Sequence, residues 1–187
     1  DQRGSGLSQR FPRSSYSSMK TMTDEVGGVI AHYRKSPTQK VFLLGHSWGA
    51  MLATAYINEH PTAINGAILS EPGGFIWQDV IDYVGRTRDF GITSEPLNDV
   101  MYTDQFFTGN EDNHIILDYK FALMSGVDID DGNEGHSLIW RMGAVINGAL
   151  NDLGMNAKPN WTTNLSQYTT KVLFMYSERN KAYGYDH

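Results

Sequence analysis

The residues best suited to chemistry are the five of Gly45-His46-Ser47-Trp48-Gly49, which fit the pattern Gly-x-Ser-x-Gly. An apolar run at 41–44 precedes them and a helix-like run follows them. This order is typical of a nucleophilic serine displayed on a sharp turn from strand to helix. The glycines are expected to remove collisions at a strained turn, and the helix N-terminus to favour negative charge beside Ser47. We therefore predict that Ser47 is a covalent nucleophile.

The elements around this turn alternate between strands and helices. Apolar runs predict strands at 40–44, 64–70 and 171–176, and helical spacing predicts helices at 21–34 and 48–59. The alternation indicates an α/β protein with a mostly parallel sheet, and such apolar strands are expected to be covered on both faces. Between the second and third strands the spacing is helical in four stretches: 76–88, 97–107, 113–125 and 136–151.

The first predicted helix, 21–34, is amphipathic. Thr21 or Thr23 is its predicted N-cap, because a hydroxyl there can accept a bond from a free backbone N–H. Its apolar face is predicted to comprise Met22, Val26, Val29, Ile30 and Tyr33.

Charge separates the middle of the chain from the rest. The net charge is −6, but residues 75–165 carry 14 acidic and 5 basic side chains, or −9, and the remainder carries +3. The segment has the composition of a solvated surface or of a pocket that attracts a cationic substrate. Cations are not clustered, so nucleic acid is excluded as a partner, and no apolar run is long enough for a membrane span. The chain has no cysteine, which excludes disulfides and thiolate metal sites.

Two motifs carry a resemblance to a known family. The stretch Asp1-Gln2-Arg3-Gly4-Ser5-Gly6-Leu7-Ser8 resembles the D-Q-R-G-x-G-x-S loop of the proline iminopeptidase-like serine hydrolases. The Gly-x-Ser-x-Gly turn is similar to the nucleophile elbow of the same family. The resemblance implies an α/β-hydrolase fold with a helical cap inserted after the strand at 64–70. It also implies that the backbone N–H of Trp48 is one oxyanion donor. Contacts of Asp1 and Arg3 are expected to stabilise the first loop rather than to act in catalysis.

The acid and the base are less clear from the sequence. Where relatives place an aspartate after the last of these strands, this chain has Asn180, and Asn180 and the nearby Glu178 are alternative candidates for the acid position. An amide cannot stabilise an imidazolium by charge, so we predict that Glu71 is the acid, because it follows the strand next to the nucleophile strand. A capping role or a contact with a substrate amine are the alternatives for Glu71. None of the six histidines is in the expected position of the base: His32, His46, His60, His114, His136 and His187.

These features predict three regions. Residues 1–74 are a part of the hydrolase core, 75–165 an acidic helical cap, and 166–187 a return to the core. The expected activity is acyl transfer on a small-molecule or peptide substrate with a free N-terminal amine, as in aminopeptidases, without a metal or cofactor. The alternatives are a carboxylesterase or lactonase of the same fold, and a non-catalytic protein that binds a ligand under the cap. Compartment and oligomeric state do not follow from the sequence.

The number of strands leads to a further expectation about the chain. Three strands are visible, whereas the fold they resemble has about eight. We therefore expect an internal segment of a longer protein, without the N-terminal strands and the C-terminal histidine loop. The outer edge of the strand at 40–44 is expected to be bare or paired with a segment outside this numbering. No histidine is expected within hydrogen-bonding distance of the Ser47 hydroxyl.

Overall fold

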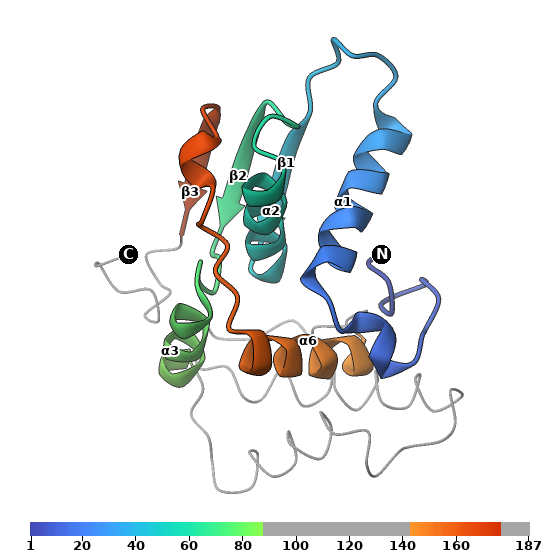
Figure 1. Ribbon diagram of the computed structural model, residues 1–187, viewed down its shortest axis with the longest axis vertical. Helices are drawn as coiled ribbons and strands as arrows, with labels where there is room; N and C mark the ends of the chain where they lie inside the picture. Colours follow the sequence, from blue (N-terminus) through green and yellow to red (C-terminus); the bar gives the residue numbers. More distant parts are fainter. Residues whose placement is uncertain (88–142, 177–187) are drawn as a thin grey trace, which may run out of the picture. The chain divides into compact units, whose positions relative to one another are not determined.

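The computed structural model describes residues 1–87 and 143–176, which form parts of two compact units (Figure 1). One unit contains Met19–Gly85 and the chain from Ala157 onward, and it includes the sheet. The other contains Asp1–Ser18 and the segment Arg86–Asn156. The boundaries of these two units differ from those of the three regions proposed from the sequence, and that division into three regions stays a prediction.

Three parallel strands place the carboxyl ends of neighbouring chain segments at one edge. The strands are β1 (Phe42–His46), β2 (Gly66–Ser70) and β3 (Lys171–Met175), in the order β1-β2-β3. All three were predicted, although β1 ends two residues later than expected because its ladder continues to the pair His46 and Ser70. In this register His46, Ser70 and Met175 are aligned across the sheet. The residues that follow the ends of β1 and β2, Ser47 and Glu71, therefore lie at the same edge of the sheet.

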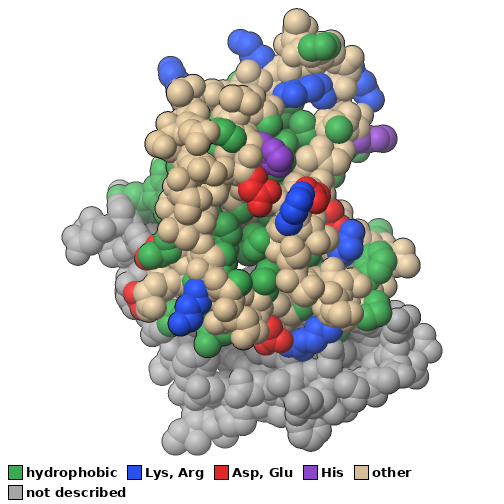
Figure 2. All heavy atoms as spheres, viewed as in Figure 1, with side chains coloured by type: hydrophobic (Ala, Val, Ile, Leu, Met, Phe, Trp, Pro, Cys, Tyr) green, Lys and Arg blue, Asp and Glu red, His purple; other side chains and the backbone are tan. Residues whose placement is uncertain are grey.

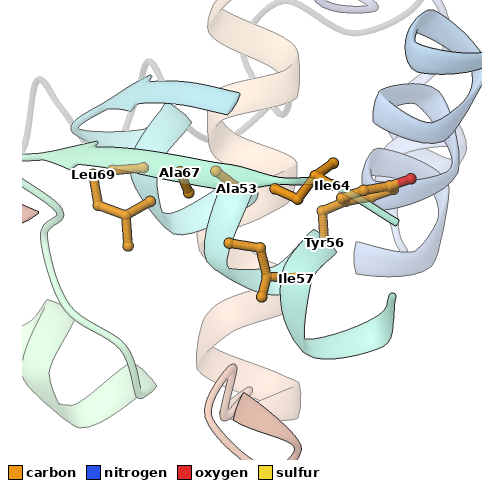
Figure 3. Packing of buried hydrophobic residues seen from close by; sticks show 7 residues of the cluster. Ala53, Tyr56, Ile57, Ile64, Ala67 and Leu69 are labelled. Carbon is orange, nitrogen blue, oxygen red and sulfur yellow. The ribbon is translucent and has the colours of Figure 1, made fainter. Parts of the chain in front are cut away.

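Helix α2 (Trp48–Glu59) connects β1 to β2 and packs against the sheet. Most of its residues are apolar and most are buried, so tertiary packing stabilises the helix, which has no side-chain cap. Figure 3 shows its residues Ala53, Tyr56 and Ile57 beside residues on and just before β2. This cluster is the main core of the unit, and its buried members are Ala50, Ala53, Tyr56, Ile57, Ile64, Ala67 and Leu69.

Helix α1 (Met19–Tyr33) packs beside α2, but it differs from the sequence prediction at both ends. It begins before Thr21 and Thr23, so neither is the N-cap. Thr23 is instead fully buried, and its hydroxyl donates a 2.7 Å hydrogen bond to Glu59 Oε2 of α2. Among the residues predicted for its apolar face, Val29 and Tyr33 are 59% and 65% exposed.

The buried stripe of α1 is therefore narrower than predicted. Met22 is fully buried, while Val26 and Ile30 pack against the main core. These three residues are spaced four apart, and residues at this spacing lie above one another on a helix. The apolar contact with the core follows this row, and Thr23 beside it adds its hydrogen bond to Glu59, whereas Val29 and Tyr33 remain exposed.

The chain leaves the sheet after β2 and returns to it before β3 through one antiparallel crossing. Ile76 pairs with Asn160 in an isolated bridge. The Trp77 N–H donates to the Pro159 carbonyl at 2.9 Å, and the Trp161 N–H donates to the Phe75 carbonyl at 3.0 Å. Helix α3 (Trp77–Thr87) starts at this crossing, and a short 3-10 helix, η4 (Leu165–Gln167), follows it.

The helical stretches predicted between β2 and β3 are described only in part. Helix α3 corresponds to the stretch 76–88. Helix α6 (Ala144–Ala157) overlaps the stretch 136–151 but extends further towards the C-terminus. The stretches 97–107 and 113–125 lie outside the described residues.

Contacts within the first turns of the chain hold the Asp1–Ser8 loop together. The Asp1 carboxylate accepts a 2.9 Å bond from the Leu7 N–H, and Gly6 has a φ of 55°, with its Cα facing that carboxylate. The Arg3 guanidinium lies 5.0 Å from the ring centre of Phe11. The 3-10 helix η1 (Arg13–Tyr16) follows the loop. Asp1 and Arg3 thus stabilise the loop in the way the sequence suggested.

One face of the sheet carries exposed apolar side chains. Phe42 and Leu44 of β1 are 64% and 73% exposed, and Leu173 and Met175 of β3 are 54% and 47% exposed. The register places these residues on one face, opposite to the face that packs on α2. The prediction that both faces are covered is therefore wrong for this structure. No strand among residues 1–87 and 143–176 pairs with the outer edge of β1, in agreement with the sequence expectation.

Other apolar side chains reach the surface in several places, as Figure 2 shows for one side of the molecule. None of the helices in the described part of the chain is long and apolar enough to cross a bilayer.

Candidate active site

Ser47 occupies the turn between β1 and α2, with φ 52° and ψ −119°. An L-residue rarely adopts a positive φ, and holding one there costs about 1–3 kcal/mol. The turn is fixed from both sides, because the Ser47 N–H donates to the Ser70 carbonyl at 2.9 Å and the Ser47 carbonyl accepts from Ala50 N at 3.0 Å. The side chain is exposed. The backbone therefore holds the hydroxyl at the carboxyl edge of the sheet, where a substrate can reach it.

The two glycines of the motif do not serve the same purpose. A Cβ on Gly45 would collide with the Gly49 carbonyl and lie 2.6 Å from Ala50 N, which are backbone atoms and cannot rotate away. A Cβ on Gly49 would meet no atom of the described residues within 4 Å. The expectation that both glycines prevent collisions is therefore correct for Gly45 and wrong for Gly49.

Helix α2 begins at Trp48, directly after Ser47. The first amides of a helix have no acceptor in the preceding turn, and they carry the positive end of the helix dipole. Ala50 N and Met51 N already donate to the Ser47 carbonyl, at 3.0 and 3.2 Å. The positive end of the α2 dipole therefore lies directly after Ser47, where it favours negative charge.

Glu71 directly follows β2, at the same edge of the sheet as Ser47. It also has a positive φ, 47°, and its N–H donates to the Met175 carbonyl at 2.8 Å. Its carboxylate is 23% exposed, and Glu71 Oε2 lies 3.4 Å from His46 Nε2, whose imidazole is 66% exposed. The structure therefore brings together Ser47 and Glu71 on neighbouring strand ends, with His46 beside the carboxylate.

The contact between His46 and Glu71 is absent from the sequence-based prediction. Its origin is the strand register, which aligns His46 with Ser70, so that Glu71 follows in line with Ser47. At 3.4 Å the contact is an ion pair when the imidazole is protonated and is long for a hydrogen bond.

The other two histidines in the described ranges lie at the C-terminal ends of α1 and α2, away from the nucleophile turn. His32 is exposed in the last turn of α1, with its ring 4.8 Å from that of Tyr33. His60 ends α2, and its ring packs on Tyr56 with 4.8 Å between the ring centres. None of the three histidines in the described ranges forms a hydrogen bond with the Ser47 hydroxyl, and the expectation for all six stays a prediction. His114, His136, His187, Glu178 and Asn180 lie outside the described residues.

No group of three or more side chains in 1–87 and 143–176 is arranged to hold a metal ion. The described site consists of an exposed hydroxyl, a helix N-terminus and a carboxylate with an imidazole beside it.

A comparison with protein families identifies the class of the chain. The model of the serine aminopeptidase S33 family matches residues 1–119, which include the Asp1–Ser8 loop, Ser47 and Glu71. The chain belongs to this family. The S33 proteins are hydrolases of the α/β-hydrolase superfamily, and the small parallel sheet with its helices agrees with that fold. No curated protein and no solved structure matches the chain. The match is to the family as a whole, and the proline iminopeptidases are not singled out.

Proposed function

We propose that this S33 hydrolase acts by acyl transfer through Ser47. The observation that carries the proposal is the backbone of Ser47, held at φ 52° between a parallel strand and the N-terminus of α2. The hydroxyl oxygen attacks the carbonyl carbon of the substrate and loses its proton to a base. The resulting oxyanion accepts a hydrogen bond from the Trp48 N–H. Collapse of this intermediate expels the leaving group and leaves an acyl-enzyme that water hydrolyses.

We assign the acid of the site to Glu71. Its carboxylate is largely buried and lies at the end of the strand next to the one that carries Ser47, whereas Asn180 has no charge to stabilise an imidazolium. Glu71→Gln is expected to lower kcat on the order of a hundredfold or more, and Asn180→Ala much less, because only the first removes a charge. Equal losses, or a larger loss for Asn180→Ala, would reject the assignment and favour an acid on the segment after β3.

The proposed substrate is a peptide or amide with a free N-terminal amine. Support comes from the family and from the net charge of −9 on residues 75–165, because an acidic segment raises the local concentration of a cationic substrate. The test compares a dipeptide amide with its N-acetylated form, in which a neutral acetamide replaces the charged amine. A markedly lower kcat/KM for the acetylated form is expected.

The same assay distinguishes the aminopeptidase proposal from the two alternatives, an esterase or lactonase and a ligand-binding protein. Equal kcat/KM for the two forms, together with turnover of a neutral ester, would contradict the aminopeptidase proposal and indicate a carboxylesterase or lactonase. Absence of turnover on every substrate, with tight binding retained, would indicate a ligand-binding protein of this fold.

A further inference from the structure

A second cluster of buried side chains lies beside the nucleophile turn. It lies where α2 packs near the isolated bridge between Ile76 and Asn160. Trp77 and Trp161, the residues that follow the two bridge partners, both belong to the cluster. Trp48, the residue after Ser47, packs against the same cluster. The buried members are Met51, Ala55 and Trp161, and the partly buried ones are Met19, Trp48, Trp77 and Val80.

Two polar atoms in this cluster have no partner. The indole N–H groups of Trp161 and Trp77 are buried, and neither forms a hydrogen bond with an atom of residues 1–87 or 143–176. Trp161 is only 4% exposed, so its N–H is remote from bulk water. A buried donor without an acceptor destabilises a protein by about 1–3 kcal/mol, and such donors are uncommon. Two such donors in one cluster call for an acceptor that the described residues do not supply.

The hydrophobic side chains that pack around these donors supply no strong acceptor. The carbonyls of Phe75 and Pro159 already accept the backbone N–H groups of Trp161 and Trp77. The remaining members of the cluster are Met, Ala and Val side chains together with Trp48, and these side chains contain no oxygen. A thioether sulfur is only a weak acceptor. The cluster is thus an apolar surface with two donors and no strong acceptor of its own.

The donors define the chemistry of a partner. An indole N–H can only donate, so an ammonium group would find no acceptor here. A carboxylate would be buried among apolar side chains, where burying a charge costs far more than burying a neutral group. A neutral carbonyl oxygen on an apolar body satisfies both requirements.

We propose that this tryptophan cluster is a subsite for an apolar part of the substrate that carries a neutral carbonyl oxygen, bound by the indole N–H groups of Trp161 and Trp77. Trp48, which packs against the cluster, is the residue after Ser47, so the subsite adjoins the nucleophile turn along the chain. The inference rests on the proposed function in one respect, that the molecule bound here is the one attacked by Ser47.

The test uses the full chain with Ser47→Ala, so that binding is measured without turnover. Its probes are acetophenone and ethylbenzene, which have similar size and differ in the carbonyl oxygen. Their dissociation constants are measured by calorimetry in the parent and in Trp161→Phe and Trp77→Phe variants of it. Each variant loses an N–H and retains an aromatic ring. Lost packing weakens both probes, so the ratio of the two dissociation constants isolates the hydrogen bond.

We expect the parent to prefer acetophenone, and each variant to lose about three- to tenfold of that preference, the effect of one hydrogen bond. Tyr56→Phe is the matched control, because it removes a polar atom from the separate main core, and it should leave the preference unchanged. If Trp161→Phe does not fold, Trp77→Phe supplies the answer, since Trp77 is only partly buried.

The result that overturns the proposal is an unchanged preference in the variants, or no preference in the parent. Either would mean that the two donors hold only water. A preference that depends on the tryptophans in a protein whose Ser47 proves unreactive would support the subsite and reject the proposed hydrolytic function, so the two failures are distinguishable.

Discussion

The two glycines of the nucleophile turn offer a matched pair of substitutions with opposite expected results. In Gly45→Ala the new Cβ would lie 2.6 Å from Ala50 N and closer still to the Gly49 carbonyl, where ordinary contacts begin at 3.4 Å. The turn must open by about 1 Å, and overpacking of this kind costs about 3 kcal/mol when no side chain can move aside. In Gly49→Ala the Cβ enters open space on α2, and alanine restricts the unfolded chain, so a gain of about 0.5 kcal/mol is expected.

The assay for this pair has two parts. Urea unfolding measures the change in stability, and the rate of reaction with a serine-directed phosphonate measures the position of the Ser47 hydroxyl. A displacement of about 1 Å at a reacting group can lower the rate on the order of a hundredfold, so Gly45→Ala should react much more slowly than Gly49→Ala. Equal stability and equal reactivity of the two variants would refute the steric explanation of the motif.

Two further predictions concern the helix contact and the core. Thr23→Val should destabilise the fold by about 1.5 kcal/mol because it removes a hydroxyl bonded to the Glu59 carboxylate. Thr54→Val, also buried but bonded to the Ala50 carbonyl within its own helix, should cost about 0.5 kcal/mol, and similar losses in urea unfolding would contradict this. Burial raises the pKa of Tyr56 above its ordinary 10.0, so the stability due to its neutral form is complete below pH 10 and is lost as pH rises through the folded-state pKa. Unfolding measured from pH 9 to 11 should show this loss, and Tyr56→Phe should reduce it.

The sequence was informative where a local pattern determines the structure. The apolar runs predicted all three strands, and Gly-x-Ser-x-Gly predicted the turn at Ser47, because strained backbone and glycine requirements are local properties. The positive φ of Glu71 could not be inferred, since nothing in its neighbours demands it.

The sequence was less informative where partners are distant in the chain. Thr23 has the residue type of an N-cap, and only the packing of α1 on α2 turns its hydroxyl towards Glu59. The contact of His46 with Glu71 depends on the register of β1 and β2, which periodicity does not define. The crossing that brings Trp77 near Trp161 joins residues more than 80 positions apart in the printed sequence.

The central claim, that Ser47 is the nucleophile, is tested most directly by labelling the full chain with a fluorophosphonate and locating the adduct by peptide mass spectrometry. The prediction is one adduct, on Ser47, which disappears in Ser47→Ala and persists in Ser166→Ala, a change at an exposed serine of η4. An adduct on another residue, or undiminished labelling of Ser47→Ala, would contradict the claim.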